Sequence, residues 1–383
     1  MRDAVIVQAV RTPVGRRNGG LAGIHPVDLS AHVLGALAER AAIDPALVDD
    51  VIWGVVGQVG EQAANVARSA VLAAGWPEQV PGTTVDRQCG SSQQAIHFAA
   101  AAVASGQADL VVAGGAESMS RVPMGSARRS GPGLPFGPLM EKRYGGHEFN
   151  QGLGAELLAA RYDLARTWLD EYSLSSQQRA ARARLGGAFD AEIAPVTTEA
   201  GVVAQDEGIR ESTLEGLAGL RAAFKEDGVV TAGNSSQISD GAAAVLVTTS
   251  ERARELGLTP WARVHTAVAI GDDPIAMLGA PAPATRRALD RAGLGLDDID
   301  TFEVNEAFAS VVGAWLAETG VSPEKVNPLG GAIALGHPLG GSGARIATTL
   351  LHHLHARGQR YGLQVMCEAG GMANATIFEN LRR

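Results

Sequence analysis

The chain has 383 residues, of which 46% are hydrophobic, and its formal net charge at pH 7 is −9. The acidic balance argues against a nucleic-acid-binding protein, and no stretch approaches the ~18 consecutive apolar residues of a membrane span. The two cysteines, Cys89 and Cys367, provide no disulfide framework, so we expect a reducing, cytoplasmic setting.

The first part of the chain is predicted to alternate between strands and helices. The spacing of apolar residues, with Gly and Pro as stops, predicts strands at residues 4–10, 48–56, 82–85 and 109–113, and helices at residues 26–42, 63–74 and 91–104. The 48 glycines and the low aromatic content suit elements that pack closely. This pattern is typical of a layered α/β fold.

The end of the chain repeats this layout. A helix is predicted from residue 341 to about 355, closed by Gly358, and a strand follows at residues 361–366. Gly106 and Gly358 are 252 positions apart, and so are the strand starts Asp109 and Tyr361. The common shift favours an internal duplication of two similar halves about a pseudo-twofold axis, although a chance match of two elements is the alternative.

The composition changes between the two halves. Residues 130–137 read as a loop, residues 152–161 and 175–184 as helices, and residues 192–207 as a polar, strand-like segment. Insertions of this length commonly carry binding function. The second half restarts with a strand at residues 244–248, a helix at 284–292 and a strand at 299–304. We therefore expect an N-terminal half at residues 1–117, an inserted loop domain at 118–237 and a C-terminal half at 238–383.

Cys89 lies between a predicted strand and a long predicted helix. Backbone N–H groups and the helix dipole favour a thiolate at such a position. A thiol with the ordinary pKa of about 8.5 is only slightly ionised at pH 7, so a nucleophilic cysteine needs this help or a nearby base. The alternative is an inert, buried cysteine, which is the commoner state of an isolated one.

His337 lies in the glycine-rich segment GGAIALGHPLGGSG, residues 330–343. So many glycines predict a constrained loop that presents an imidazole just before a helix. The shift of 252 places His337 four residues before the position equivalent to Cys89, Gly341. Pseudo-symmetric packing would bring the two helix starts to one centre, where a nucleophile and its base could meet. A histidine held only by backbone hydrogen bonds is the alternative.

Two further polar positions follow predicted strands. Cys367 precedes Glu368-Ala369-Gly370, where the backbone is free to present N–H groups. Asn305 follows the strand at 299–304, and its amide could hold a water or an oxyanion, or simply cap the next helix. The segment GVVGQVG at residues 54–60 lacks the G-x-G-x-x-G spacing, so we reject a dinucleotide site there.

An ordered set of segments connects these residues to a known family. They are VRTPVGRRNGGLAG (10–23), VDRQCGSSQQAI (85–96), AGGAESMS (113–120), RESTLEGLAGLRAAF (210–224), TAGNSSQISDGAAAV (231–245), EVNEAFA (303–309), GGAIALGHPLGGSGAR (330–345) and MCEAGGMANATIFE (366–379). With these segments, the sequence resembles the thiolases over essentially its whole length.

The resemblance implies the thiolase fold, an α/β fold in which two similar βαβαβαββ halves form five layers, αβαβα, with a loop domain inserted into the first half. It also implies a homodimer or homotetramer that acts on acyl-CoA substrates. Coenzyme A is then a substrate, and we expect no permanently bound cofactor and no metal. The implied reaction is thiolytic cleavage of 3-ketoacyl-CoA to acetyl-CoA and a shortened acyl-CoA.

The resemblance also implies roles for individual residues. Cys89 attacks the acyl group and holds it as a thioester, with His337 as its base, and Cys367 exchanges the α-proton of the acetyl-CoA unit. His337 and a water on Asn305 hold the enolate oxygen, and the backbone N–H groups of Cys89 and Ala369 form the oxyanion hole. Of the coenzyme A contacts, Ser236 touches the pantetheine and Arg210 lies near the adenine.

At three positions that bear on activity, the residue differs from the one that many thiolases carry. Ala369 replaces a glycine, which costs about 1 kcal/mol if that position has a positive φ. Leu329 replaces an asparagine, and Gln151 replaces a methionine beside the acyl pocket. Biosynthetic formation of acetoacetyl-CoA, an inactive scaffold subunit and a decarboxylating ketosynthase are the alternatives, and the second cysteine argues against the last.

Overall fold

The computed structural model describes residues 2–129 and 131–382. The first half contributes the strands β1 (Val5–Arg11), β2 (Gly15–Arg16), β3 (Asp50–Gly54), β4 (Gly82–Val85), β5 (Leu110–Ser118) and β8 (Ser239–Thr248). The second half contributes β9 (Ala262–Gly271), β10 (Thr301–Val304), β11 (Tyr361–Glu368) and β12 (Met372–Asn380).

The two halves share one strand order. The first runs β3-β5-β8-β1 and the second runs β10-β11-β12-β9, and β4 extends the first at its edge. In each half the first pair is parallel and the next two pairs are antiparallel. The halves meet where β1 pairs with β9, through Val5 with Arg263 and Ile6 with Ala262. The shared order confirms the duplication that the sequence predicted.

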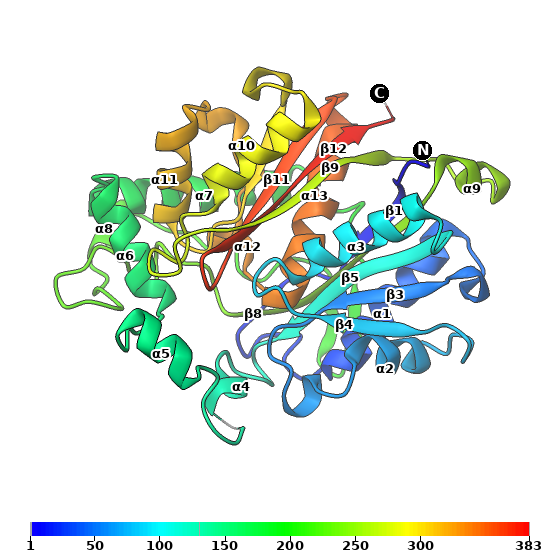
Figure 1. Ribbon diagram of the computed structural model, residues 1–383, viewed down its shortest axis with the longest axis horizontal. Coiled ribbons are helices and arrows are strands. Elements are labelled where there is room, and N and C mark those ends of the chain that lie inside the picture. The colour runs from blue at the N-terminus through cyan, green and yellow to red at the C-terminus, as the bar shows by residue number, and fades with distance from the viewer. Residues whose placement is uncertain (1, 130, 383) are drawn as a thin grey trace.

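Helices cover both faces of each half and produce five layers (Figure 1). On the outside lie α1 (Pro26–Ala41) and α2 (Val66–Ala73) against the first half, and α10 (Pro281–Ala292) and α11 (Ala309–Thr319) against the second. The middle layer is formed by α3 (Ser91–Ser105) and α13 (Ser342–Arg357), which contact each other and strands of both halves. α13 buries residues on all its sides, as a helix between the two halves of the sheet must.

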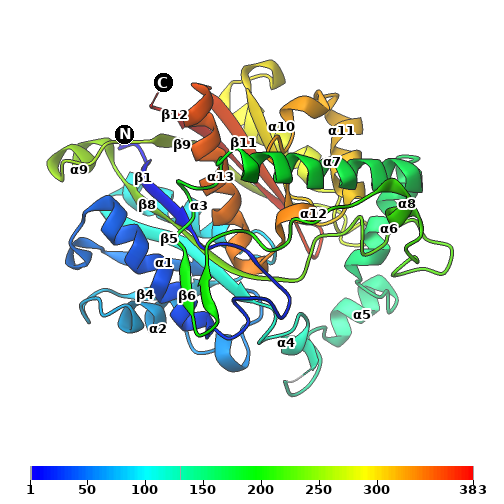
Figure 2. The ribbon, with the colours of Figure 1, turned by 180° about the vertical axis from the view of Figure 1, so that it is seen from behind.

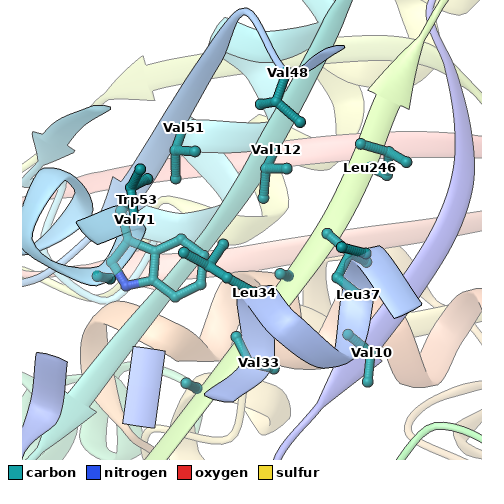
Figure 3. Packing of buried hydrophobic residues seen from close by; sticks show 14 of the residues in the cluster. Val10, Val33, Leu34, Leu37, Val48, Val51, Trp53, Val71, Val112 and Leu246 are labelled. Carbon is teal, nitrogen blue, oxygen red and sulfur yellow. The ribbon is translucent and has the colours of Figure 1, made fainter. Parts of the chain in front are cut away.

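Apolar side chains hold α1 to the sheet (Figure 3). Val33, Leu34 and Leu37 of α1 share a fully buried cluster with Val112 and Leu246 of β5 and β8. Burying each of these side chains stabilises the fold by roughly 1.5–3 kcal/mol. This packing fixes the strands at whose ends the catalytic segments begin.

The two middle helices approach closely at their N-termini. The backbone N–H of Ala344 donates to Oγ of Ser92 over 2.9 Å, and these residues are 252 positions apart. A Cβ atom on Gly343 would collide with the backbone of Gln93, so glycine is required for this approach. The predicted meeting of the two helix starts is therefore present.

A long insertion connects β5 to β8 of the first half. It contains α4 (Ser126–Arg129), α5 (Pro138–Tyr144), α6 (Gln151–Arg161), α7 (Arg166–Leu185), β6 (Val196–Thr198), β7 (Gly201–Val203) and α8 (Leu214–Ala218). Figure 2 shows α6 and α7 beside elements of the second half, and they contact α11 and α12 (Ala332–Leu335). The insertion therefore spans the two halves.

The three-part division of the chain stays a prediction, and the strand pairing bears on its second boundary. A boundary at residue 238 assigns β8 to the C-terminal half, yet β8 lies between β1 and β5 and is the equivalent of β12. By pairing alone, the first half extends to residue 248, and α9 (Ser250–Glu255) leads into the second. Among the described residues, no helix is both long and apolar enough to cross a membrane.

Candidate active site

Cys89 lies in the turn between β4 and α3. Gln88 before it has a φ of 48°, in the left-handed region, and Gly90 after it caps α3, which begins at Ser91. Strained residues of this kind concentrate at functional sites. Burial raises the pKa of the Cys89 thiol well above its ordinary value, and Cys367 and Glu368 raise it further. The predicted preference for a thiolate is therefore outweighed by burial, and Cys89 needs a base.

His337 lies between α12 and α13, and its surroundings define its tautomer. Oγ of Ser342 donates to the carbonyl of Pro338 over 2.9 Å, so it must accept from Nδ1–H of His337, 2.5 Å away. Nε2 is then the unprotonated nitrogen and faces Nδ2 of Asn305 at 3.5 Å. Burial, followed by the charge of Arg345, lowers the pKa of His337 to about 3. The imidazole is therefore a neutral base.

Cys367 at the end of β11 contacts the same asparagine. The side chain of Asn305 and the backbone N–H of Ala307 both form hydrogen bonds with its thiol, yet burial dominates and raises its pKa to about 12. Oδ1 of Asn305 is buried and has no partner within the described part of the chain. Cys367, Asn305 and His337 thus form one connected group, and Cys89 lies close enough to Cys367 to sense its charge.

Ala369 follows in the turn between β11 and β12. The positive φ values in this turn fall on Gly370, at 91°, and Gly371, at 74°, and not on Ala369. The strain that an alanine would suffer in the left-handed region is therefore absent. Ala369 is half-buried and packs on the apolar cluster that contains Cys367.

Glu306 anchors the loop that carries the histidine. Its carboxylate accepts hydrogen bonds from the hydroxyls of Tyr172 and Ser176, each over 2.8 Å, and from the backbone N–H of Ile333 over 3.0 Å. A Cβ atom on Gly331 would collide with this carboxylate. Glu306 therefore ties α7 of the insertion to the histidine loop.

Glu117 at the end of β5 is a second anchor, which the sequence reasoning missed. It is buried, and it accepts backbone N–H groups of Val56 and Gly57, each over 3.0 Å, and of Gly340 over 2.8 Å. It thus joins the 54–60 loop to the histidine loop. The signal available was an acidic residue at the end of an apolar strand, within AGGAESMS.

The two residues predicted to bind coenzyme A lie at different depths. The backbone N–H of Ser236 donates to the carbonyl of Ala307 over 2.9 Å, which places Ser236 beside the segment that contacts Cys367. Arg210 is exposed, and its backbone N–H is held by Gln177 over 3.0 Å. The described residues contain no cluster of three or more His, Cys, Asp or Glu side chains able to hold a metal ion.

A buried thiol, a neutral imidazole base and a second thiol suit acyl transfer through a thioester. Residues 4–251 match the model of the thiolase N-terminal domain and residues 258–380 that of the thiolase C-terminal domain. The chain belongs to the thiolase family, which makes it an acyltransferase with the thiolase fold.

The sequence similarity to known proteins covers the whole chain. It is 54% identical to steroid 3-ketoacyl-CoA thiolase FadA6 of Mycobacterium tuberculosis, over 100% of this chain and 95% of that protein. It is 44% identical to beta-ketoadipyl-CoA thiolase of Escherichia coli, over 100% of both chains. The crystal structure of acetyl-CoA acetyltransferase of Bacillus anthracis superposes with a TM-score of 0.91 at 40% identity, over 100% of this chain and 99% of that one.

Proposed function

We propose that the chain cleaves 3-ketoacyl-CoA to acetyl-CoA and a shortened acyl-CoA through an acyl thioester on Cys89. The observation that carries the proposal is the grouping of two buried thiols with His337 and Asn305, because the chemistry needs one sulfur to bond to carbon and another to exchange a proton. The names of relatives that act on 3-ketoacyl-CoA esters support it.

The steps follow from the protonation states. Nε2 of His337 takes the proton of Cys89 as the sulfur attacks the 3-keto carbon, and backbone N–H groups of Cys89 and Ala369 hold the resulting oxyanion. The bond between C2 and C3 then breaks, and the thiol of Cys367 protonates C2 of the departing acetyl-CoA. Free coenzyme A then gives its thiol proton to the thiolate of Cys367 and attacks the acyl-Cys89 thioester. The shortened acyl-CoA leaves, and the released sulfur of Cys89 takes its proton back from His337.

Asn305 and His337 have a second role in this scheme. Oδ1 of Asn305 lacks a partner among the described residues and can orient a water towards the enolate oxygen that forms as the bond breaks. In this scheme Ser236 contacts the pantetheine, and exposed Arg210 lies near the adenine of coenzyme A. No permanently bound cofactor is needed for any step.

Within the class of 3-ketoacyl-CoA esters, the candidate substrates differ in their acyl group. The 54% identity to a protein named steroid 3-ketoacyl-CoA thiolase favours bulky, ring-derived acyl groups beside linear ones. The likeness to an acetyl-CoA acetyltransferase favours acetoacetyl-CoA formation as the second candidate. The intact pair of cysteines speaks against an inactive scaffold. We further propose a cytoplasmic homodimer or homotetramer, on the family resemblance.

Thiolysis tests the proposal directly. Purified protein is supplied with coenzyme A and with acetoacetyl-CoA, longer linear 3-ketoacyl-CoA esters or a steroid-derived 3-ketoacyl-CoA. We expect loss of the 3-ketoacyl-CoA with stoichiometric formation of acetyl-CoA. The absence of turnover on every ester, in protein whose fold is verified by circular dichroism, would overturn the proposal. Turnover restricted to acetoacetyl-CoA would favour the second candidate.

A further inference from the structure

Glu368 is a buried carboxyl that the proposed reaction does not use. It follows Cys367 in β11, and because successive side chains of a strand alternate, it faces the start of α3. Its exposure is 0%. A Cβ atom on Gly90 would collide with Oε1 of Glu368, so the carboxyl lies against the residue that follows Cys89. It therefore lies close to both cysteines.

The carboxyl lacks the donors that an ionised form requires. Neither of its oxygens has a hydrogen-bond partner in the described part of the chain, and nor does Oδ1 of Asn374. A Cβ atom on Gly90 would also lie 2.9 Å from this Oδ1, so the two unpartnered acceptors meet at the same glycine. Two acceptors that lie against one residue cannot bond to each other, but a protonated carboxyl carries a proton that it can donate to the second acceptor.

Asn374 connects this pair to the turn that carries the nucleophile. Its Nδ2 donates to the carbonyl of Gly90 over 3.1 Å. A protonated Glu368 that donates to Oδ1 of Asn374 would complete a chain of hydrogen bonds from β11 through β12 to Gly90. The chain would hold the backbone next to Cys89 without adding charge.

The charged and titratable groups around Glu368 come from two elements. Burial is the largest effect and raises the pKa of Glu368 to about 8. In the loop before α3, the charge of Arg87 favours the carboxylate and that of Asp86 opposes it. The cysteines complete the set, since an ionised Glu368 raises the pKa of Cys89 and of Cys367. A carboxylate here and a thiolate at Cys89 therefore oppose each other.

We propose that Glu368 is a positioning residue whose protonated carboxyl holds Asn374 and Gly90, and whose carboxylate, once formed, opposes the thiolate of Cys89. The inference rests on the proposed role of Cys89 as nucleophile. At neutral pH the carboxyl keeps its proton and orients Asn374 and Gly90. As the pH rises, the carboxyl ionises before the thiol does, and its charge raises the pH at which Cys89 forms a thiolate.

The test is the pH dependence of Cys89 alkylation by iodoacetamide, read from the mass of the Cys89 peptide so that Cys367 is counted separately. In the Glu368→Gln variant the opposing charge is absent at every pH. We expect its alkylation midpoint to fall by about one pH unit relative to the unmodified protein, as for removal of a like charge within a few ångströms.

Glu303 offers a matched control. It is also a buried carboxyl, and burial raises its pKa to about 8, but the charges that act on it are those of Arg345, Glu306, Glu192 and Arg179. Glu303→Gln should leave the Cys89 midpoint unchanged. An unchanged midpoint in Glu368→Gln, or an equal shift in both variants, would overturn the inference.

A replacement variant and a separate readout complete the test. If Glu368→Gln does not fold, Glu368→Met, of similar length and without charge, takes its place and must give the same shift. The alkylation assay uses no 3-ketoacyl-CoA, so a failure of thiolysis counts against the proposed function and an unmoved midpoint counts against the inference. A purely structural role would lower alkylation evenly across pH and leave its midpoint in place.

Discussion

Oγ of Ser342 lies 2.5 Å from Nδ1 of His337 and accepts its proton in a hydrogen bond. The same hydroxyl donates to the carbonyl of Pro338. One serine thereby fixes which nitrogen of the histidine is the base. The base is then positioned by α13, the helix that also packs against the helix following Cys89.

Removal of the Ser342 hydroxyl should weaken the base. In Ser342→Ala, Nδ1 loses its acceptor and the imidazole can adopt either tautomer, so we expect kcat for thiolysis to fall by at least about ten-fold with a smaller change in KM. Steady-state kinetics measures both. The control is Thr348→Val, six residues further along α13. The Thr348 hydroxyl donates to the carbonyl of Ala344 over 2.8 Å, and its removal should leave kcat within about two-fold.

The two glycines after Ala369 should differ in their tolerance of a side chain. Gly370 has a φ of 91°, but its Cβ would meet only Cε of Met372 at 3.9 Å, so Gly370→Ala should cost about 1 kcal/mol of unfolding free energy. Gly371 has a φ of 74°, and its Cβ would lie 2.7 Å from the backbone of Asp273, so Gly371→Ala should cost more. Urea denaturation compares them. Equal costs would contradict the backbone described for this turn.

Ala369→Gly restores the glycine that many thiolases carry at this position. Because Ala369 does not occupy the left-handed region, glycine relieves no strain there and should lower the unfolding free energy slightly, by up to about 1 kcal/mol. We expect kcat to stay within about two-fold. A stabilised variant with a much higher kcat would show that alanine distorts the oxyanion hole.

Stability should fall in acid because of buried His97. Burial, with Arg87, lowers its pKa to about 3 from an ordinary value of 6.5. The unfolded chain therefore takes up a proton as the pH falls below 6.5, whereas the folded one does not until about pH 3. This lowers the unfolding free energy by about 1.4 kcal/mol per pH unit in that window.

Replacing His97 should remove its share of this slope. In His97→Asn, we expect the unfolding free energy between pH 6 and 4 to depend less steeply on pH than in the unmodified protein, measured by urea denaturation at each pH. His355→Asn, at an exposed histidine, is the control and should leave the slope unchanged. Parallel slopes in all three proteins would contradict the assigned burial of His97.

Cys367→Ala should separate the two halves of the reaction. Acyl transfer between an acyl-CoA and labelled coenzyme A needs only Cys89 and its base, and we expect this exchange to persist. Cleavage of the carbon–carbon bond needs the proton of Cys367, so thiolysis should fall by roughly 10²–10⁴. Loss of both activities, in a variant that keeps its fold, would contradict the division of roles.

Elements with clear apolar periodicity could be predicted from the sequence. The strand at 82–85 and the start of the helix at residue 91 agree with β4 and α3, and the helix predicted from 341 agrees with α13 to within a residue at its start. Other elements were missed. β9 and β12 were not predicted, and α7 begins at Arg166 rather than 175.

The missed elements have polar residues on buried faces. In α7, Asp170, Ser176 and Gln177 are buried and bond to Asn234, Glu306 and the carbonyl of Ile333. In β12, Asn374 and Thr376 are buried against the middle helices. These polar residues bond to partners far away in sequence, so local periodicity carries no sign of their burial.

The candidate site, too, could be predicted from the sequence only where local patterns are informative. The positions of Cys89 and His337 just before two equivalent helices of the duplication, α3 and α13, could be predicted. The anchor from Glu117 to Gly340 spans 223 positions and the contact between the carboxyl of Glu368 and Gly90 crosses the two halves, so neither could be read from a local pattern. Burial, which raises the pKa of the Cys89 thiol, could not be read from the local pattern either.

The most direct test of the central claim is the mass of the Cys89 peptide after the protein is mixed with a 3-ketoacyl-CoA in the absence of free coenzyme A. The account predicts that the shortened acyl group accumulates on Cys89, with one equivalent of acetyl-CoA released, and that added coenzyme A removes it. An acyl group found on Cys367, or acetyl-CoA released with no adduct on Cys89, would contradict it.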